Sequence, residues 1–188
     1  FQKEATPFFF DGFISNEKKF LKLMNSIENL QHYSEQEKLK LEKSINNISG
    51  EYSFVTYNKV SKILCISRDV FGTRPLYMIN NGDEIVFASE IKFIKKILKE
   101  DLNINEEKII SFLCQFRKNK TETFFEGVQS LNPGTTLIFQ RGSMEKLRKE
   151  IFVKAYEGTF DEAKAILRKV LSNSIKNTVE NPEKTAIL

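Results

Sequence analysis

The residues best suited to nucleophilic or metal chemistry in this sequence are two cysteines and one histidine. Cys65 and Cys114 lie far apart, no Cys-x-x-Cys pair occurs, and His32 is the only histidine. A structural zinc site needs several Cys or His ligands at short spacing, and a disulfide scaffold needs several cysteine pairs. We therefore expect no metal site. We expect Cys65 in a buried strand, Cys114 on the apolar face of a helix, and His32 on the surface without catalytic-triad partners.

A second set of residues could organise a turn rather than react. Residues 68–77 read Arg-Asp-Val-Phe-Gly-Thr-Arg-Pro-Leu-Tyr. Arg68 and Asp69, at a strand end, could hold the turn through charge-assisted hydrogen bonds. Gly72 offers a backbone conformation closed to other residues, and Pro75 presets the following strand. We interpret these four residues as architectural, with a plain turn and a surface ion pair as the alternative.

The elements that must position these residues belong to an ordinary globular chain. It has 188 residues, 40% hydrophobic and 29% charged, which is a typical folded composition. The net charge of +4 is not concentrated, and four lysines fit the solvated face of one helix, so we expect no nucleic-acid partner. No apolar run approaches the ~20 residues of a membrane span, so we expect no membrane partner. The four lysines are Lys92, Lys95, Lys96 and Lys99.

The hydrophobic pattern predicts an α+β fold. We expect a strand at 7–10 closed by a turn at Asp11-Gly12, and then two helices, the second capped by Ser34 and Glu37. Residues 50–88 read as an antiparallel meander. Helices are predicted at 89–98 and 106–116, strands at 135–139 and 150–155, a long helix beginning at Thr159, and a strand at 185–188. The change from a mixed helix and antiparallel-sheet pattern to a helix leading into an apolar strand places a domain boundary between 153 and 154.

Several motifs resemble one known family. They are residues 50–54, 68–77, 87–92 (Phe-Ala-Ser-Glu-Ile-Lys), 124–128 and 131–135. Together they resemble the class II glutamine amidotransferase domain of the asparagine synthetases. The resemblance covers about residues 7 to 188. It implies a four-layer αββα, Ntn-hydrolase-like sandwich of antiparallel sheets for 1–153, with the front of the domain missing. Residues 154–188 would begin the α/β synthetase domain that binds ATP.

The resemblance also implies site residues. Glutamine-hydrolysing members use an N-terminal cysteine whose α-amine acts as base, and this sequence begins at Phe1, so we expect the chain to lack the nucleophile. An Asn-Gly pair that forms the oxyanion hole matches Asp11 and Gly12. Asp11 brings a carboxylate where a donor is required, which makes the site degenerate. A Ser-Asp-x-Glu element that holds the glutamine α-amine matches Ser34-Glu35, with Glu35 one methylene longer. A plain capping box remains the alternative there.

The function implied is an ATP-dependent, amide-forming ligase. ATP and Mg²⁺ would activate aspartate or a similar acid as an acyl-adenylate, which ammonia, taken as such or from glutamine, would then aminate. Leu188 would lie against the nucleotide, but the pyrophosphate loop would follow it, so the fragment itself should bind no cofactor. A degenerate, non-catalytic scaffold and a ring-closing or peptide-modifying ligase remain alternatives. We expect a cytoplasmic protein; a homodimer is left open.

Overall fold

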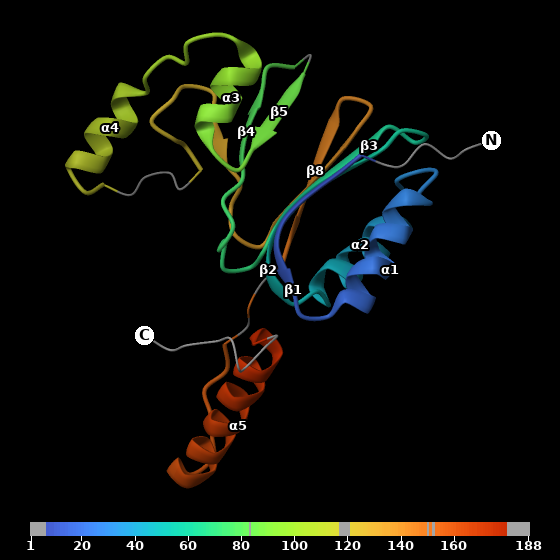
Figure 1. Cartoon of the computed structure of the whole chain (residues 1–188), viewed down its shortest axis with the longest axis vertical. Helices are drawn as coiled ribbons and strands as arrows, with labels where there is room; N and C mark the ends of the chain where they lie inside the picture. The colour runs from blue at the N-terminus through green and yellow to red at the C-terminus, as the bar shows by residue number, and fades with distance from the viewer. Residues whose placement is uncertain (1–6, 83, 117–120, 150, 152, 180–188) are drawn as a thin grey trace. The chain divides into compact units, whose positions relative to one another are not determined.

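The computed structural model describes residues 7–82, 84–116, 121–149, 151 and 153–179, and it divides into two compact units (Figure 1). The first unit is Phe1–Glu150 and the second is Ile151–Leu188. No helix among the described residues is long and apolar enough to cross a membrane.

The first unit contains two antiparallel sheets, which confirms the predicted α+β class. The larger has the order β1-β2-β3-β7-β8 and the smaller the order β5-β4-β6. The larger sheet is built from β1 (Phe8–Ile14), β2 (Gly50–Asn58), β3 (Ile63–Arg68), β7 (Thr135–Gln140) and β8 (Ser143–Arg148). The smaller is built from β4 (Tyr77–Asn80), β5 (Ile85–Ala88) and β6 (Gln129–Ser130).

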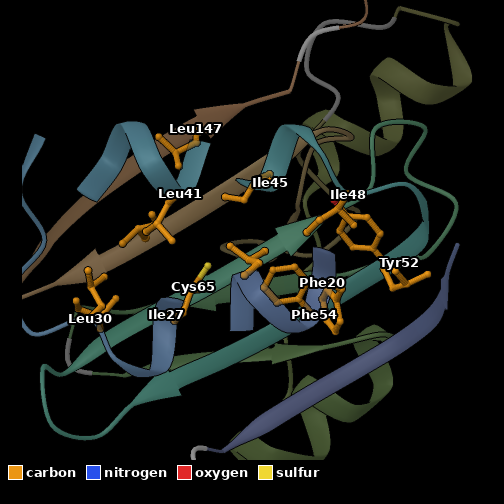
Figure 2. Close-up of a cluster of buried hydrophobic side chains, with 14 residues drawn as sticks. Phe20, Ile27, Leu30, Leu41, Ile45, Ile48, Tyr52, Phe54, Cys65 and Leu147 are labelled. Atoms are coloured by element: carbon orange, nitrogen blue, oxygen red, sulfur yellow. The ribbon is translucent and has the colours of Figure 1, made fainter. Parts of the chain in front are cut away.

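Two helices, α1 (Glu17–Glu28) and α2 (Glu35–Asn46), cover one face of the larger sheet. Their apolar faces meet inward-facing side chains of the strands in one cluster (Figure 2), which includes Ile27, Leu41, Phe54 and Cys65. Such burial of side chains on both sides is the main source of stability in this layer. Asn58 fastens the end of α1, because its buried side-chain amide donates to the carbonyl oxygens of three residues between 27 and 30.

The opposite face of the larger sheet packs against the smaller sheet. A second cluster joins β2, β3 and β7 to β4, through residues such as Val55, Ile66 and Met78. A third cluster joins the far face of the smaller sheet to α3 (Ile91–Leu98) through Val86 and Ile94. The contacts therefore order the unit as helices, larger sheet, smaller sheet and helix. A short helix, α4 (Glu106–Leu113), follows and has no buried residue.

Several local predictions are corrected by the sheet pairing. Asp11 and Gly12 are not a turn but lie within β1, paired with Ser53 and Tyr52 of β2. Residues 50–88 are not one meander, since β2 and β3 join the larger sheet while β4 and β5 join the smaller. The strand predicted at 150–155 lies partly outside the described residues, and the described residues 151 and 153–155 are not in a strand. β8 pairs with β7 through the turn at Arg141-Gly142.

The second unit contains α5 (Phe160–Thr178). Thr159 and Glu162 form a reciprocal capping box at its start, as predicted: the Thr159 hydroxyl accepts from the Glu162 N–H, and the Glu162 carboxylate accepts from the Thr159 N–H. The hydrogen bonds that the carboxylate accepts from the Thr159 N–H and from the Thr159 hydroxyl lower the pKa of Glu162. The strand predicted at 185–188, with the nucleotide contact expected at Leu188, lies outside the described residues.

Candidate functional site

The turn after β3 is built around the side chain of Arg68, which is bonded to three main-chain carbonyls. Its Nε donates to Arg74 O at 2.7 Å, its Nη1 to Leu131 O at 2.6 Å, and its Nη2 to Gly72 O at 2.6 Å. Burial lowers the pKa of the Arg68 guanidinium, while neighbouring Asp69 raises it. Hydrogen bonds from a charged donor are among the stronger ones in proteins. Arg68 thus ties residues 72, 74 and 131 together.

Asp69 fixes the same turn from inside. It is 1% exposed, and its carboxylate accepts hydrogen bonds from the Phe71 N–H at 2.9 Å and the Arg74 N–H at 3.4 Å. Its own N–H donates to Tyr52 O at 2.8 Å. Arg68 and Asp69 therefore bond the main chain of the turn rather than form a simple surface pair. Between them they hold both the N–H and the carbonyl of Arg74.

Gly72 is required by the crowding inside this turn. Its φ of +66° lies in the left-handed region, and a Cβ there would stand 2.7 Å from Pro133 Cγ and 3.2 Å from Arg68 Cζ. Glycine alone meets both conditions without strain. Pro75 directly precedes Leu76, which is fully buried between the sheets.

A row of polar side chains crosses one end of the larger sheet on the face that bears the smaller sheet. The pairing register places Asp11 of β1 opposite Ser53 of β2, and Ser53 opposite Arg68 of β3. Because side chains alternate between faces along a strand, this row shares its face with Phe9 and Val55 of the inter-sheet cluster. Ser53 is 0% exposed, and its Oγ has no hydrogen-bond partner among the described residues.

Arg74 reaches over this row to Asp11. Its Nη1 lies 3.9 Å from Asp11 Oδ1, and both side chains are about two-fifths exposed, at 42% and 36%. The separation is too long for a hydrogen bond, so the two groups interact through charge alone. The buried Nε of Arg74 has no hydrogen-bond partner in the described part of the chain.

The backbone of Gly12 lies beside this pair at the edge of the sheet. Tyr52 is paired with Gly12, but its carbonyl accepts from Asp69 N on the β3 side. In an antiparallel ladder the groups of alternate residues point to opposite neighbours, so the Gly12 N–H points away from β2. Gly12 also permits close approach of the strands, since a Cβ at its φ of +129° would lie only 1.9 Å from Glu51 O.

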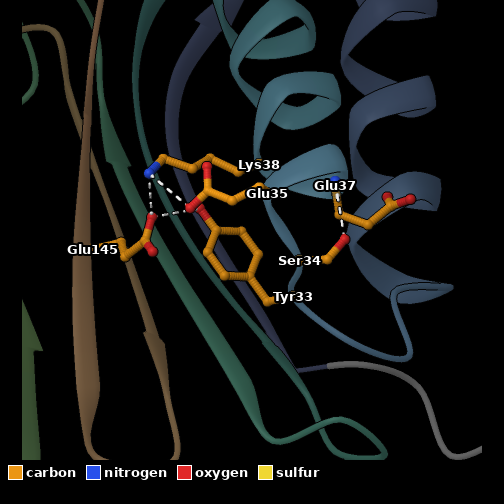
Figure 3. Close-up of polar contacts among 6 residues, drawn as sticks. All are labelled: Tyr33, Ser34, Glu35, Glu37, Lys38 and Glu145. Atoms are coloured by element: carbon orange, nitrogen blue, oxygen red, sulfur yellow. Dashed lines mark hydrogen bonds and ion pairs between the residues drawn. The ribbon is translucent and has the colours of Figure 1, made fainter.

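Glu35 is not brought to this site. Lys38 Nζ lies 3.5 Å from Glu35 Oε1 and 3.0 Å from Glu145 Oε2 on β8, and Tyr33 donates to the same Glu145 oxygen (Figure 3). The Glu145 carboxylate and burial raise the pKa of Tyr33, with burial the larger cause.

The strand order explains this separation. β8 and β1 are opposite edges of the larger sheet, about 19 Å apart at four strand spacings. Glu145 also pairs with Ile138 of the helix-covered face, whereas Asp11 faces the smaller sheet. The structure therefore places Glu35 at the N-terminus of α2, where Ser34 accepts a hydrogen bond from the Glu37 N–H, and keeps it apart from Asp11 and Gly12.

The remaining candidates have no part in this site. Cys65 is buried as predicted, but Cys114 is exposed at the end of α4, because α4 buries no residue. The prediction of a core position for Cys114 is therefore wrong. His32 is exposed. No group of three or more His, Cys, Asp or Glu residues that could hold a metal ion occurs among the described residues.

Sequence reasoning alone did not single out Arg74 or Ser53. Both stand within motifs already noted, Ser53 in 50–54 and Arg74 in 68–77. Alternation along β2 could have placed Ser53 on the same face as Val55. The reach of Arg74 to Asp11 depends on the shape of the turn, which no periodicity encodes.

Comparison with known proteins matches the first unit to a described family. A family profile described as "Glutamine amidotransferase domain" matches residues 29–152. The "Putative asparagine synthetase (glutamine-hydrolyzing) 1" of Methanocaldococcus jannaschii is 26% identical over 162 residues, covering 84% of this chain and 26% of that protein. "Asparagine synthetase (glutamine-hydrolyzing) 1" of Bacillus subtilis is 29% identical over 94 residues, covering 50% of this chain and 15% of that protein.

Among solved structures, glutamine phosphoribosylpyrophosphate amidotransferase of B. subtilis is similar with a TM-score of 0.47 and 17% identity, covering 81% of this chain and 31% of that one. The chain spans about a quarter or less of the length of the two curated relatives it matches.

Proposed function

Because this chain belongs to the glutamine amidotransferase domain family of the asparagine synthetases, we propose that it is the amidotransferase-type domain of an ATP-dependent, amide-forming ligase. The proposal is carried by the family match over residues 29–152, together with relatives named as glutamine-hydrolysing asparagine synthetases. The whole protein would activate a carboxylic acid, aspartate or a similar one, and ammonia would displace the activating group to form an amide.

Glutamine is the proposed nitrogen source, in keeping with the family name. The site that supports this role is the end of β1, where the outward N–H of Gly12 lies beside the Asp11–Arg74 pair. A backbone N–H aimed at a reacting carbonyl oxygen stabilises the negative charge that develops there. The ATP and Mg²⁺ of the proposed reaction are expected at Leu188 and beyond it, outside the described residues.

A second candidate is a non-catalytic domain that serves as a scaffold. The observation that favours it is the Asp11 carboxylate, which stands at the position where the family pattern has an amide donor. Loss of one such donor costs about 2.7–4 kcal/mol of transition-state stabilisation. A domain of this kind would retain the turn built by Arg68, Asp69 and Gly72, because those residues hold the fold.

The test uses the full-length protein with Mg-ATP and a panel of acidic amino acids. The nitrogen source is either ¹⁵N-ammonium or amide-¹⁵N-glutamine. We expect AMP formation that depends on one acid of the panel, and ¹⁵N in the amide product from glutamine as well as from ammonium, detected by mass spectrometry. Formation of neither AMP nor labelled amide with any acid would overturn the ligase proposal and leave the scaffold.

A further inference from the structure

We infer that Arg74 supplies the donor that Asp11 cannot supply at the oxyanion position, with Asp11 acting as the positioning residue for its guanidinium. The inference rests on the proposed function, since it concerns hydrolysis of the glutamine amide. On this inference Asp11 belongs to an altered oxyanion site, and its carboxylate does not mean that the site has lost its function.

Asp11 by itself cannot donate a hydrogen bond to an oxyanion. An ionised carboxylate only accepts hydrogen bonds, so Asp11 alone would repel a developing oxyanion. Arg74 Nη1, 3.9 Å away, balances that charge. The pair is then neutral overall, as a single amide side chain would be.

The guanidinium of Arg74 makes no hydrogen bond to the other residues that the structure describes. Its contact with Asp11 is longer than a hydrogen bond, and its buried Nε has no partner in the described part of the chain. The Ser53 hydroxyl, fully buried in the row beneath, is also without a partner among the described residues. Buried donors without acceptors are uncommon in folded proteins, and here they point to an acceptor such as a negatively charged oxygen.

The main chain of Arg74, from which the guanidinium extends, is held in place before any ligand binds. Its N–H donates to Asp69, and its carbonyl accepts from Arg68. A fixed main chain limits where the guanidinium can lie, and this reduces the reorganisation needed to stabilise a transition state. The motif at residues 68–77, which we interpreted from the sequence as architectural, thus also directs the Arg74 side chain toward the end of β1.

In the proposed hydrolysis of the glutamine amide, the Gly12 N–H and the Arg74 guanidinium together stabilise the negative charge that develops on the carbonyl oxygen. When a thiol nucleophile of the full-length protein adds to the amide carbon of glutamine and gives up its proton, an S–C bond forms and the π electron pair of the C=O bond moves onto oxygen. We place that oxygen between the Gly12 N–H and the Arg74 guanidinium. The pair then returns to form C=O, the C–N bond breaks, and nitrogen leaves as ammonia with the proton that the thiol gave up. Water then adds to the thioester, the S–C bond breaks and the sulfur regains a proton from that water, so that overall glutamine and water become glutamate and ammonia.

The experiment measures two activities of the full-length protein separately. Glutamate release from glutamine reports this inference, and ammonium-dependent amide formation reports the proposed function. We expect Arg74→Gln to reduce glutamate release about 10²–10³-fold, the range for loss of one oxyanion donor. Ammonium-dependent amide formation should not fall. Arg148→Gln, which removes an exposed arginine on the opposite sheet edge, is the matched control.

A second background separates this role from a structural one. In the D11N background an amide donor stands at position 11 and no carboxylate needs balancing, so R74Q should reduce glutamate release less than tenfold. If Arg74 were only structural, R74Q would reduce glutamate release by the same factor in both backgrounds. An equal loss in both backgrounds, no loss from R74Q, or no glutamate release by the unmodified protein would each overturn the inference. Amide formation from ammonium would still support the ligase in all three cases.

Discussion

At the scale of single residues, the two thiols of the chain have opposite surroundings. Cys65 lies in β3 between α1, α2 and the sheet, and it is 1% exposed. Its burial raises the pKa of the thiol to about 12. Cys114 is exposed at the end of α4. Since the thiolate is the reactive form, the two should differ sharply in reactivity.

We therefore expect a disulfide reagent such as DTNB to label one thiol of the native 188-residue chain, and both thiols after unfolding in guanidinium. Cys114→Ser should abolish the fast native reaction, and Cys65→Ser should leave it. Fast labelling of two thiols in the native chain would contradict the buried position of Cys65.

Alkaline pH should weaken the fold through two buried groups. Burial raises the pKa of both Cys65 and Tyr52 to about 12, above the unfolded values of about 8.5 and 10. The native state thus holds these protons more tightly, so the stabilisation is complete below about pH 8 and is lost as pH rises toward 12.

The free energy of unfolding is measured in urea at several pH values between about 8 and 11, with circular dichroism as the probe of unfolding. Cys65→Ala should show a shallower fall with pH than the unmodified chain, although its stability at neutral pH is lower because of the cavity. Identical slopes for the two proteins would refute the contribution of Cys65.

At the scale of elements, the local sequence pattern predicts individual helices, whereas the pairing of the strands decides which residues come together. The apolar spacing and caps predicted α1, α2, α3 and α5 to within a few residues, because these signals are local. Asp11-Gly12 reads locally as a turn, yet pairing with Ser53 and Tyr52 extends β1 through it. The separation of Glu35 from Asp11 likewise depends on strand order, which joins β1 and β8 only as opposite edges. The periodicity and caps of a single sequence are local signals, so they do not predict such long-range pairing.

The turn after β3 offers a prediction with a matched glycine control. Gly142 has a φ of +79° with nothing near its Cβ position, whereas Gly72 has a similar φ with Pro133 and Arg68 in the way. Gly142→Ala should cost about 1–2 kcal/mol, the cost of the left-handed conformation alone. Gly72→Ala should cost more, because the turn must also shift.

Thermal and urea unfolding of the two variants give these differences directly. Equal losses of stability would mean that the crowding around Gly72 is relieved without cost. In that case the turn would be softer than its hydrogen bonds to Arg68 and Asp69 indicate.

At the scale of the whole molecule, the two units differ in how they bury apolar surface. All three core clusters draw their residues from Phe1–Glu150. In the second unit the apolar residues of α5 are about half exposed, as at Ile166 and Val170. A helix whose apolar face is exposed gains little from tertiary packing.

We accordingly expect removal of residues 159–188 to leave the unfolding of the first unit nearly unchanged. The midpoint in urea, followed by tyrosine fluorescence, should shift by less than the equivalent of about 0.5 kcal/mol, which is usual for changes away from a core. The full 188-residue chain serves as the reference. A large loss would show that α5 contributes to the stability of the first unit.

Within the described residues β1 is an edge strand of the larger sheet, and this position bears on how the chain behaves in concentrated solution. The strand reads Phe-Phe-Phe-Asp-Gly-Phe-Ile, and Asp11 is its only charged residue. An apolar rim strand with free backbone groups can recruit the same strand of another molecule, and a single charge is a common safeguard against such self-association. Asp11 would then protect the protein from aggregation as well as orient Arg74, and the D11N variant should precipitate at lower concentration than the unmodified protein.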